Sequence, residues 1–145
     1  MNPPKILLNA ETIVHATMET VWETWTNPQY IKLWNNVSSD WHTPWAENDM
    51  RVGGKMVLRM EAKDGSAGFD FEVIYDEVIL GRKISYTVSD GRVTTIWFTK
   101  TPEGVKLTEE FEPTTQKPAA FQQAFCQSIL NNFKTCVENR GNSVF

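Results

Sequence analysis

The chain has 145 residues, the usual size of one domain and enough to bury a hydrophobic core. The net charge is −4, and lysines and arginines are scattered singly apart from Arg82-Lys83, which argues against a nucleic-acid binder with a basic patch. No apolar stretch reaches the roughly 20 residues that cross a bilayer, and residues 1–8 are too short an apolar patch for a signal peptide.

Aromatic residues are numerous: the chain has six Trp, eight Phe and three Tyr. Aromatic side chains bury large areas, so they suit a wide core and an apolar cavity equally well. Cys126 and Cys136 fall in one expected helix, where ten residues separate them by about 15 Å, beyond disulfide reach. We therefore expect two free thiols that serve core packing, in the reducing cytoplasm.

The first part of the chain predicts a strand and two short helices. Residues 5–15 are rich in β-branched residues that alternate with polar ones towards their end, which predicts a strand. Thr17 is a candidate N-cap for a helix whose apolar residues recur at helical spacing: Met18, Val21, Trp22 and Trp25. Asn27-Pro28 starts a second helix, with an N-cap before a proline at the first helical position.

Most of residues 41–113 predicts antiparallel strands joined by tight turns. Turn signals stand at Gly53-Gly54, Asp64-Gly65, Asp90-Gly91 and Glu103-Gly104. The strands expected between and after them cover residues 56–61, 67–80, 83–89, 92–101 and 105–112. Successive hairpins predict an antiparallel meander with one buried face and one solvated face.

Residues 119–140 predict one long amphipathic helix, with Asn139 and Gly141 as its stop. Its apolar stripe recurs at steps of four residues: Phe121, Phe125, Ile129, Phe133 and Val137. Such a helix needs a broad apolar partner, and the concave side of a twisted sheet is the candidate. The space between helix and sheet need not be filled by side chains, and concave apolar spaces are typical ligand sites.

Three segments carry a family resemblance. The first runs from Trp25-Thr26-Asn27-Pro28 to Leu33-Trp34. The second is Ala-Glu-Asn-Asp-Met-Arg-Val-Gly-Gly-Lys at residues 46–55, continuing into Arg59-Met60. The third is Thr-Glu-Glu-Phe-Glu-Pro at residues 108–113, followed by Ile-Leu-Asn-Asn-Phe at residues 129–133.

With these segments and its order of elements, the chain resembles the START-like/SRPBCC (Bet v 1-like) superfamily over nearly its whole length. Within it, the chain is similar to bacterial homologues of the C-terminal domain of the heat shock protein 90 ATPase activator. The resemblance implies a single α+β domain over residues 1–145 with the helix-grip fold: a curved antiparallel sheet of about six or seven strands around a long C-terminal helix.

Two departures from the family pattern would narrow or reshape the pocket: Gln127-Ser128 where such helices commonly carry Gly-Trp, and Val73 where relatives often have glycine. The superfamily includes lipid and hormone carriers, polyketide cyclases and chaperone regulators, so the fold alone does not settle the function.

Catalytic and metal-binding motifs are missing from the sequence. It has no Gly-x-Ser-x-Gly, no Ser-x-x-Lys, no cysteine supported by histidine and no phosphate-binding loop. His15 and His42 are far apart and have no metal-ligand spacing. We therefore expect no metal site and no cofactor.

Two titratable residues are weak catalytic candidates. Glu109 shares its strand parity with Leu107 and Phe111, which would aim a carboxylate into the apolar face, where it needs a partner, a ligand or a raised pKa. Arg59 and Arg92 are conceivable partners, and a carboxylate at the rim of the sheet is the alternative. His42 is either a polar group at a pocket mouth or a histidine on the strand surface.

The favoured function is binding of a small hydrophobic molecule, lipid-, polyketide- or aromatic-like, by a cytoplasmic carrier or sensor. The expected ligand-binding residues are Trp25, Trp41, Met56, Leu58, Phe71, Trp97, Glu109, Phe121, Phe125 and Ile129. One alternative is an enzyme of cyclase or hydratase type that uses Glu109 or His42 as acid or base. A second alternative is a chaperone ATPase co-regulator. The sequence also leaves a weak homodimer open, and it predicts neither nucleic-acid binding nor membrane insertion.

Overall fold

The fold is one curved antiparallel sheet that wraps around a long helix. The structure is a computed structural model and describes residues 6–36 and 38–142. In chain order the elements are β1 (Leu8–Val14), α1 (Met18–Thr26), α2 (Pro28–Trp34), β2 (Trp41–Asn48), β3 (Lys55–Ala62), β4 (Gly68–Ile79), β5 (Lys83–Val88), β6 (Val93–Thr101), β7 (Gly104–Phe111) and α3 (Ala119–Asn142). These described strands form one seven-stranded sheet in the order β1-β7-β6-β5-β4-β3-β2.

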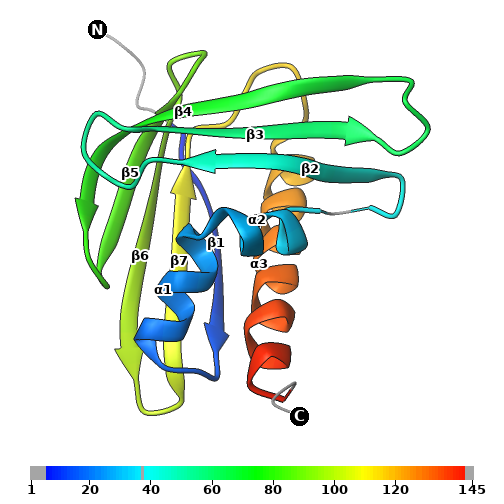
Figure 1. The fold of residues 1–145 in the computed structure, drawn as a ribbon. Coiled ribbons are helices and arrows are strands. Elements are labelled where there is room, and N and C mark those ends of the chain that lie inside the picture. Colours follow the sequence, from blue (N-terminus) through cyan, green and yellow to red (C-terminus); the bar gives the residue numbers. More distant parts are fainter. Residues whose placement is uncertain (1–5, 37, 143–145) are drawn as a thin grey trace, which may run out of the picture.

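The sheet bends so strongly that β2, β3 and β4 cross the molecule at one end, while α3 runs beside β1 (Figure 1). The two short helices lie between α3 and the bent part of the sheet. The predicted α+β helix-grip fold is confirmed.

The predicted helix starts are confirmed by the caps. The Thr17 side chain accepts a hydrogen bond from the backbone N–H of Thr20, and the Asn27 side chain accepts one from Gln29. The ends of two elements differ from the prediction. Lys5, where the first strand was expected to begin, lies outside the described residues, and α3 continues past the expected stop at Gly141.

The predicted apolar stripe of α3 is only partly its buried face. Phe133 and Leu130 are fully buried, whereas Phe121 is 52% exposed and Phe125 is 47% exposed. Steps of four residues turn a helix by slightly more than one full turn, so such a stripe drifts by about 40° per step. The first turns of α3 therefore present two aromatic rings to solvent, while the later turns pack on the sheet.

An aromatic cluster joins the three helices to the sheet. Trp25 of α1 stacks on Trp34 of α2, with ring centroids 4.7 Å apart. Both rings meet Phe133 of α3 edge to face, at 5.0 Å and 5.1 Å. Trp25 also contacts Phe98 of β6 at 6.0 Å. Edge-to-face contacts of this kind add to the free energy gained by burial, so this cluster fixes where α3 crosses the sheet.

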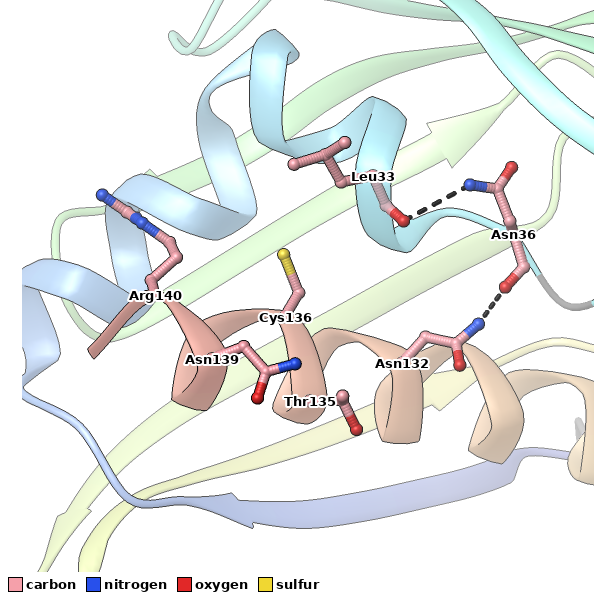
Figure 2. Close-up of a pocket in the computed structure, with 7 residues that line it drawn as sticks. All are labelled: Leu33, Asn36, Asn132, Thr135, Cys136, Asn139 and Arg140. Carbon is pink, nitrogen blue, oxygen red and sulfur yellow. Dashed lines mark hydrogen bonds between the residues drawn. The ribbon is translucent and has the colours of Figure 1, made fainter. Parts of the chain in front are cut away.

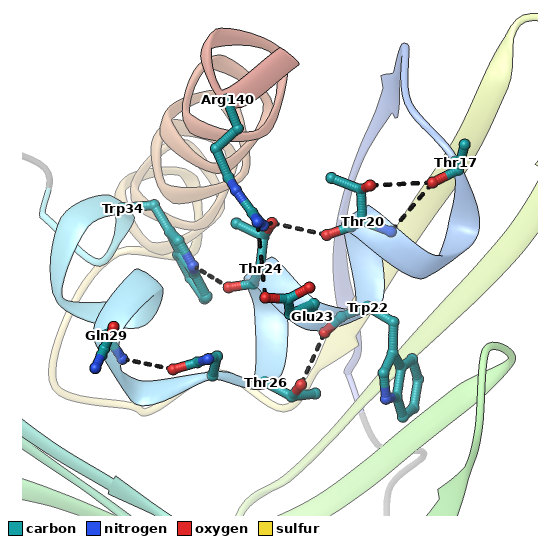
Figure 3. A network of polar contacts seen from close by, with 10 residues as sticks. Thr17, Thr20, Trp22, Glu23, Thr24, Thr26, Gln29, Trp34 and Arg140 are labelled. Atoms are coloured by element: carbon teal, nitrogen blue, oxygen red, sulfur yellow. Dashed lines mark hydrogen bonds and ion pairs between the residues drawn. The ribbon is translucent and has the colours of Figure 1, made fainter. Parts of the chain in front are cut away.

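Thr24 connects the same helices through polar contacts (Figure 3). Its side chain is fully buried, and its hydroxyl donates a hydrogen bond to the Thr20 carbonyl at 2.7 Å. The same hydroxyl accepts one from Nη1 of Arg140 on α3 at 2.6 Å. The indole Nε1 of Trp34 donates to the Thr24 carbonyl at 2.8 Å. One threonine thus ties the end of α3 and the end of α2 to α1.

Gly104 brings the β6–β7 hairpin close to the end of β1. Its φ of +150° is unfavourable for other residues, and an added Cβ would overlap the carbonyl oxygen of Val14. Gly91, in the β5–β6 hairpin, also has a positive φ (+93°) but has open space around it.

We expect the substitution Thr24→Val to lower the free energy of unfolding by about 1–2 kcal/mol, because it keeps the shape but removes the hydroxyl that bonds the Thr20 carbonyl and Arg140, which keeps its ion pair with Glu23 at 3.6 Å. Thr26→Val is the matched control: its hydroxyl also bonds the carbonyl four residues earlier, at 2.8 Å, without an arginine. Urea unfolding of both variants measures the difference. Equal losses would show that the Arg140 contact adds nothing.

We expect Gly104→Ala to lower the free energy of unfolding by about 3 kcal/mol or more, since backbone strain and steric overlap act together. Gly91→Ala should cost about 1–2 kcal/mol, from backbone strain alone. Thermal and urea unfolding compare the two. A similar loss in both variants would mean that the approach of Gly104 to Val14 relaxes freely.

Candidate functional site

β7 places Glu109 on the concave face of the sheet. Leu107 and Phe111, which share its parity, are both buried. The Cα partners of Glu109 are Ala10 on β1 and Ile96 on β6, which are buried as well. The predicted inward orientation of this carboxyl is therefore confirmed.

Two polar side chains from two other elements interact with Glu109, and a third contacts one of them. The thiol of Cys126 on α3 donates a hydrogen bond to the carboxyl. Tyr86 on β5 is near enough for the charge of Glu109 to affect its titration, and Tyr86 is hydrogen-bonded to Thr94, its partner on β6. Glu109, Cys126, Tyr86 and Thr94 are called the Glu109 cluster below.

Burial controls the titration of this cluster. Loss of solvation raises the pKa of the Glu109 carboxyl to about 7, against the opposite effect of the Cys126 hydrogen bond. Burial and the charge of Glu109 hold the pKa of Tyr86 well above its ordinary value. The pKa of the Cys126 thiol is raised for the same two reasons. Glu109 is therefore the member that changes charge near neutral pH.

The cationic partners considered for Glu109 lie elsewhere. Arg59 is on the convex face, where its Nε lies 2.8 Å from Glu61 and its Nη1 lies 3.2 Å from Asp70. Arg92 binds Asp90 in the β5–β6 turn at 2.7 Å. Neither of these two possible partners pairs with Glu109: strand parity directs Arg59 outward, and Arg92 is bound in the turn.

Glu109 is partly exposed, whereas its three neighbours in the cluster are buried. Tyr86, Cys126 and Thr94 keep 9%, 8% and 7% of their surface exposed. Further along the same elements, Ile96 on β6 and Leu130 on α3 are fully buried. Exposure thus grows towards the N-terminal end of α3, and the cluster lies where the dry core begins.

The first turns of α3, called the rim below, carry exposed aromatic rings. The rings of Phe121 and Phe125 on α3 are both about half exposed, with centroids 6.4 Å apart. The Nζ of Lys117 lies 5.2 Å from the centroid of Phe121, a cation–π distance. Ile129 follows one turn later and packs against the main core, so an apolar stripe leads from the rim inward.

A second tyrosine extends the polar groups across the concave face. The Tyr75 ring on β4 meets Tyr86 edge to face at 6.2 Å. Its hydroxyl donates to Oδ1 of Asn48 at 2.6 Å, and Asn48 donates in turn to the Thr26 carbonyl at 2.7 Å. Burial raises the pKa of Tyr75, so this hydroxyl stays protonated.

Most of the predicted ligand-binding residues share the concave face. Met56, Leu58 and Phe71 belong to the main core on β3 and β4. Trp41 contacts Phe69 at the open end of the sheet, with ring centroids 6.1 Å apart. The remaining members are Trp25 in the aromatic cluster, Ile129, Phe121 and Phe125 on α3, and Glu109.

Trp97 and His42 lie on the other side of the sheet. On β6, Ile96 and Phe98 are buried inward, so Trp97 faces outward, with Nζ of Lys83 at 6.0 Å from its ring centroid. Its placement beside a pocket was therefore wrong. His42 pairs with Glu61 on the same convex side as Arg59, which agrees with the interpretation as a strand-surface histidine.

Sequence reasoning missed Tyr86, Thr94 and Cys126 as neighbours of Glu109. Tyr86 and Thr94 are cross-strand partners in the predicted β5–β6 hairpin, so their pairing was accessible from the turn at Asp90-Gly91. Their approach to Glu109 and to Cys126 depends on the register of β7 and the rotation of α3, for which the sequence has no local signal.

A groove of about 520 Å³ between α2 and α3 is open to solvent and does not overlap the Glu109 cluster (Figure 2). It is lined by Leu33, Asn36, Asn132, Thr135, Cys136, Asn139 and Arg140. Asn132 donates a hydrogen bond to the Asn36 carbonyl, and Asn36 donates to the Leu33 carbonyl at 3.4 Å. The amides therefore serve to join the two helices, and we do not assign this groove as the site.

Cys126 and Cys136 are both free thiols, as predicted, and Cys126 is buried. In residues 6–36 and 38–142, no three His, Cys, Asp or Glu side chains gather as metal ligands. Within the same residues, no helix combines the length and apolar character needed to cross a membrane.

The chain was compared with known proteins. The family model "Activator of Hsp90 ATPase homolog 1-like protein" (AHSA1) matches residues 15–138. The NMR structure of an AHSA1-like protein from Aeromonas hydrophila is 38% identical, with a TM-score of 0.89 and coverage of 97% of both chains. A protein from Cytophaga hutchinsonii is 40% identical, with a TM-score of 0.78 over 97% of this chain and 96% of the other.

A crystal structure from Nitrosomonas europaea shares the fold at only 17% identity, with a TM-score of 0.80 over 94% of this chain and 97% of that one. The search of curated proteins found no match. The family match covers most of the chain and the structures agree with it, so the chain belongs to the family of Activator of Hsp90 ATPase homolog 1-like proteins.

Proposed function

We propose that the protein binds a small, largely apolar molecule between the concave face of its sheet and the first turns of α3. The observation that carries the proposal is the position of Glu109, a carboxyl on the apolar face where solvent still enters. A carboxyl there lowers stability, because its charged form loses hydration. A binding role accounts for a residue that packing alone would replace by an apolar one.

The surroundings describe the shape of the molecule. The aromatic rim of Phe121 and Phe125 would contact an apolar body, and the Glu109 cluster would meet a single polar group. Lipid-, polyketide- and aromatic-like molecules all have this form. We propose that the protein acts as a carrier or sensor for such a molecule in the cytoplasm.

One observation favours a second function. A carboxyl with a pKa of about 7 can give or take a proton at neutral pH, which suits an enzyme of cyclase or hydratase type. In that case Glu109→Gln would abolish turnover without loss of binding. The role of chaperone ATPase co-regulator has only the printed family description behind it and would use the outer surface.

The binding proposal can be tested with the neutral fluorescent probe N-phenyl-1-naphthylamine. We expect saturable binding of one probe per chain and an affinity about fivefold lower in Phe125→Ala, equivalent to about 1 kcal/mol. Leu80→Ala is the matched control, since Leu80 is 78% exposed and lies after β4, away from α3. An equal loss in both variants would indicate unspecific adsorption to exposed apolar groups.

The pKa of Glu109 predicts how stability depends on pH. Its pKa is raised in the folded state from 4.5 to about 7. The folded state therefore holds the proton more tightly, so the contribution of Glu109 to stability is fully present below pH 4.5 and is lost as the pH rises to 7. Between pH 5 and pH 8 the free energy of unfolding should fall by roughly 2–3 kcal/mol on this account.

Urea unfolding at pH 5 and pH 8 measures this difference in the wild type and in Glu109→Gln, which cannot ionise. The variant should lack this part of the decline. Glu110→Gln, one residue further on the strand and on its opposite face, should keep it. If Glu109→Gln shows the same decline as the wild type, Glu109 is already ionised in the folded protein at pH 5.

A further inference from the structure

The groups that face Glu109 are neutral or acidic. Cys126 faces it from α3 and Tyr86 from β5, while Ala10 of β1 and Ile96 of β6 are its backbone partners. Burial and the Cys126 hydrogen bond account for its titration, with no contribution from a cation of the described chain. An ionised carboxyl in this position has its charge uncompensated.

The cations of neighbouring elements are engaged elsewhere. Lys106 on β7 lies 3.5 Å from Glu11 on the opposite side of the strand from Glu109. Lys134 on α3 binds Glu138 at 2.6 Å and the Ile13 carbonyl at 2.7 Å, on the side of the helix that faces β1. The concave face thus carries an acid and no base within the described residues.

The rim already holds one ammonium group, that of Lys117. Lys117 places its Nζ over Phe121, and the exposed ring of Phe125 lies beside it. Aromatic faces attract cations through their quadrupole, more strongly where water is partly excluded. An ammonium group is therefore compatible with these exposed aromatic rings.

We propose that the molecule bound on the concave face is an amphipathic cation: an amine joined to an apolar, preferably aromatic body, with its ammonium group paired to the Glu109 carboxylate. This inference rests on the proposed binding function. An anionic amphiphile such as a fatty acid would be repelled by the ionised carboxylate of Glu109, so the site discriminates against it.

If the ammonium group pairs with Glu109, binding of the amine is coupled to loss of the Glu109 proton. At pH 6 the carboxyl of Glu109 holds a proton that the ammonium must displace, and the proton leaves to solvent. With a pKa of about 7, this competition weakens amine binding about tenfold at pH 6 relative to pH 8. Binding at pH 6 should release close to one proton per amine.

Calorimetry with three probes that share one apolar body tests the inference: 1-naphthylmethylamine, 1-naphthalenemethanol and 1-naphthoate. At pH 8 we expect the amine to bind about tenfold more tightly than the alcohol, and the carboxylate to bind most weakly. Glu109→Gln should bring the affinity for the amine to within about twofold of the affinity for the alcohol. Glu110→Gln should retain the preference of the wild type.

The outcomes separate the two proposals. If the amine and the alcohol bind equally, if the carboxylate binds most tightly, or if the preference survives in Glu109→Gln, the cationic ligand is wrong and the binding site stands. If none of the three probes nor N-phenyl-1-naphthylamine binds, the proposed function itself fails. Titrations at pH 6 in buffers of different ionisation enthalpy give a second readout: about one proton released with the amine and none with the alcohol.

Discussion

The packing of Phe133 against Trp25 and Trp34 determines where α3 crosses the sheet, and the site depends on that crossing. The contact lies in the second half of the helix, where Thr24 and Arg140 add a polar connection to α1. The first half is held mainly from one side. Gln123 and Gln127 donate hydrogen bonds to backbone carbonyls of β1, the edge strand. The opposite side of these turns, with Phe121 and Phe125, is left uncovered.

As a result, residues next to the second half of α3 are buried, whereas the first turns of α3 are exposed to solvent. A carboxyl beside Leu107 would lie in a fully buried core, where ionisation without a partner costs most. A carboxyl on the convex face would keep the hydration of a surface residue. Glu109 lies between these extremes, close enough to solvent to exchange a proton and deep enough to have its pKa raised to about 7. The position of Glu109 along β7 therefore determines its pKa.

Much of this architecture could be predicted from local sequence signals. The caps at Thr17 and Asn27, the hairpin turns and the parity of Glu109 each depend on a few neighbouring residues, and all were confirmed. The wrong placement of Trp97 beside a pocket has a local cause. Trp97 stands among residues that are apolar at both parities, so alternation could not say which face of β6 it occupies.

The partners of Glu109 were beyond prediction for a related reason. Cys126 reaches it only because α3 has a particular rotation, and the stripe at steps of four gave that rotation incorrectly for Phe121 and Phe125. A helix stripe shows which residues can share a face, but the sheet decides which part of that face is covered. Cross-element contacts of this kind depend on registers that no short segment of the sequence encodes.

The fold and the specificity of this protein rest on different residues. The structure from Nitrosomonas europaea keeps the fold at 17% identity, so an apolar pattern and a set of turns are enough to build the curved sheet and its helix. Such a frame excludes water from one side and admits it from the other, whatever side chain stands at the boundary. The choice of ligand then depends on the charge at that boundary. Here the boundary residue is Glu109, a carboxyl without a cationic partner among the described residues, and the proposed preference for a bound cation over an anion or a neutral molecule depends on this one charge.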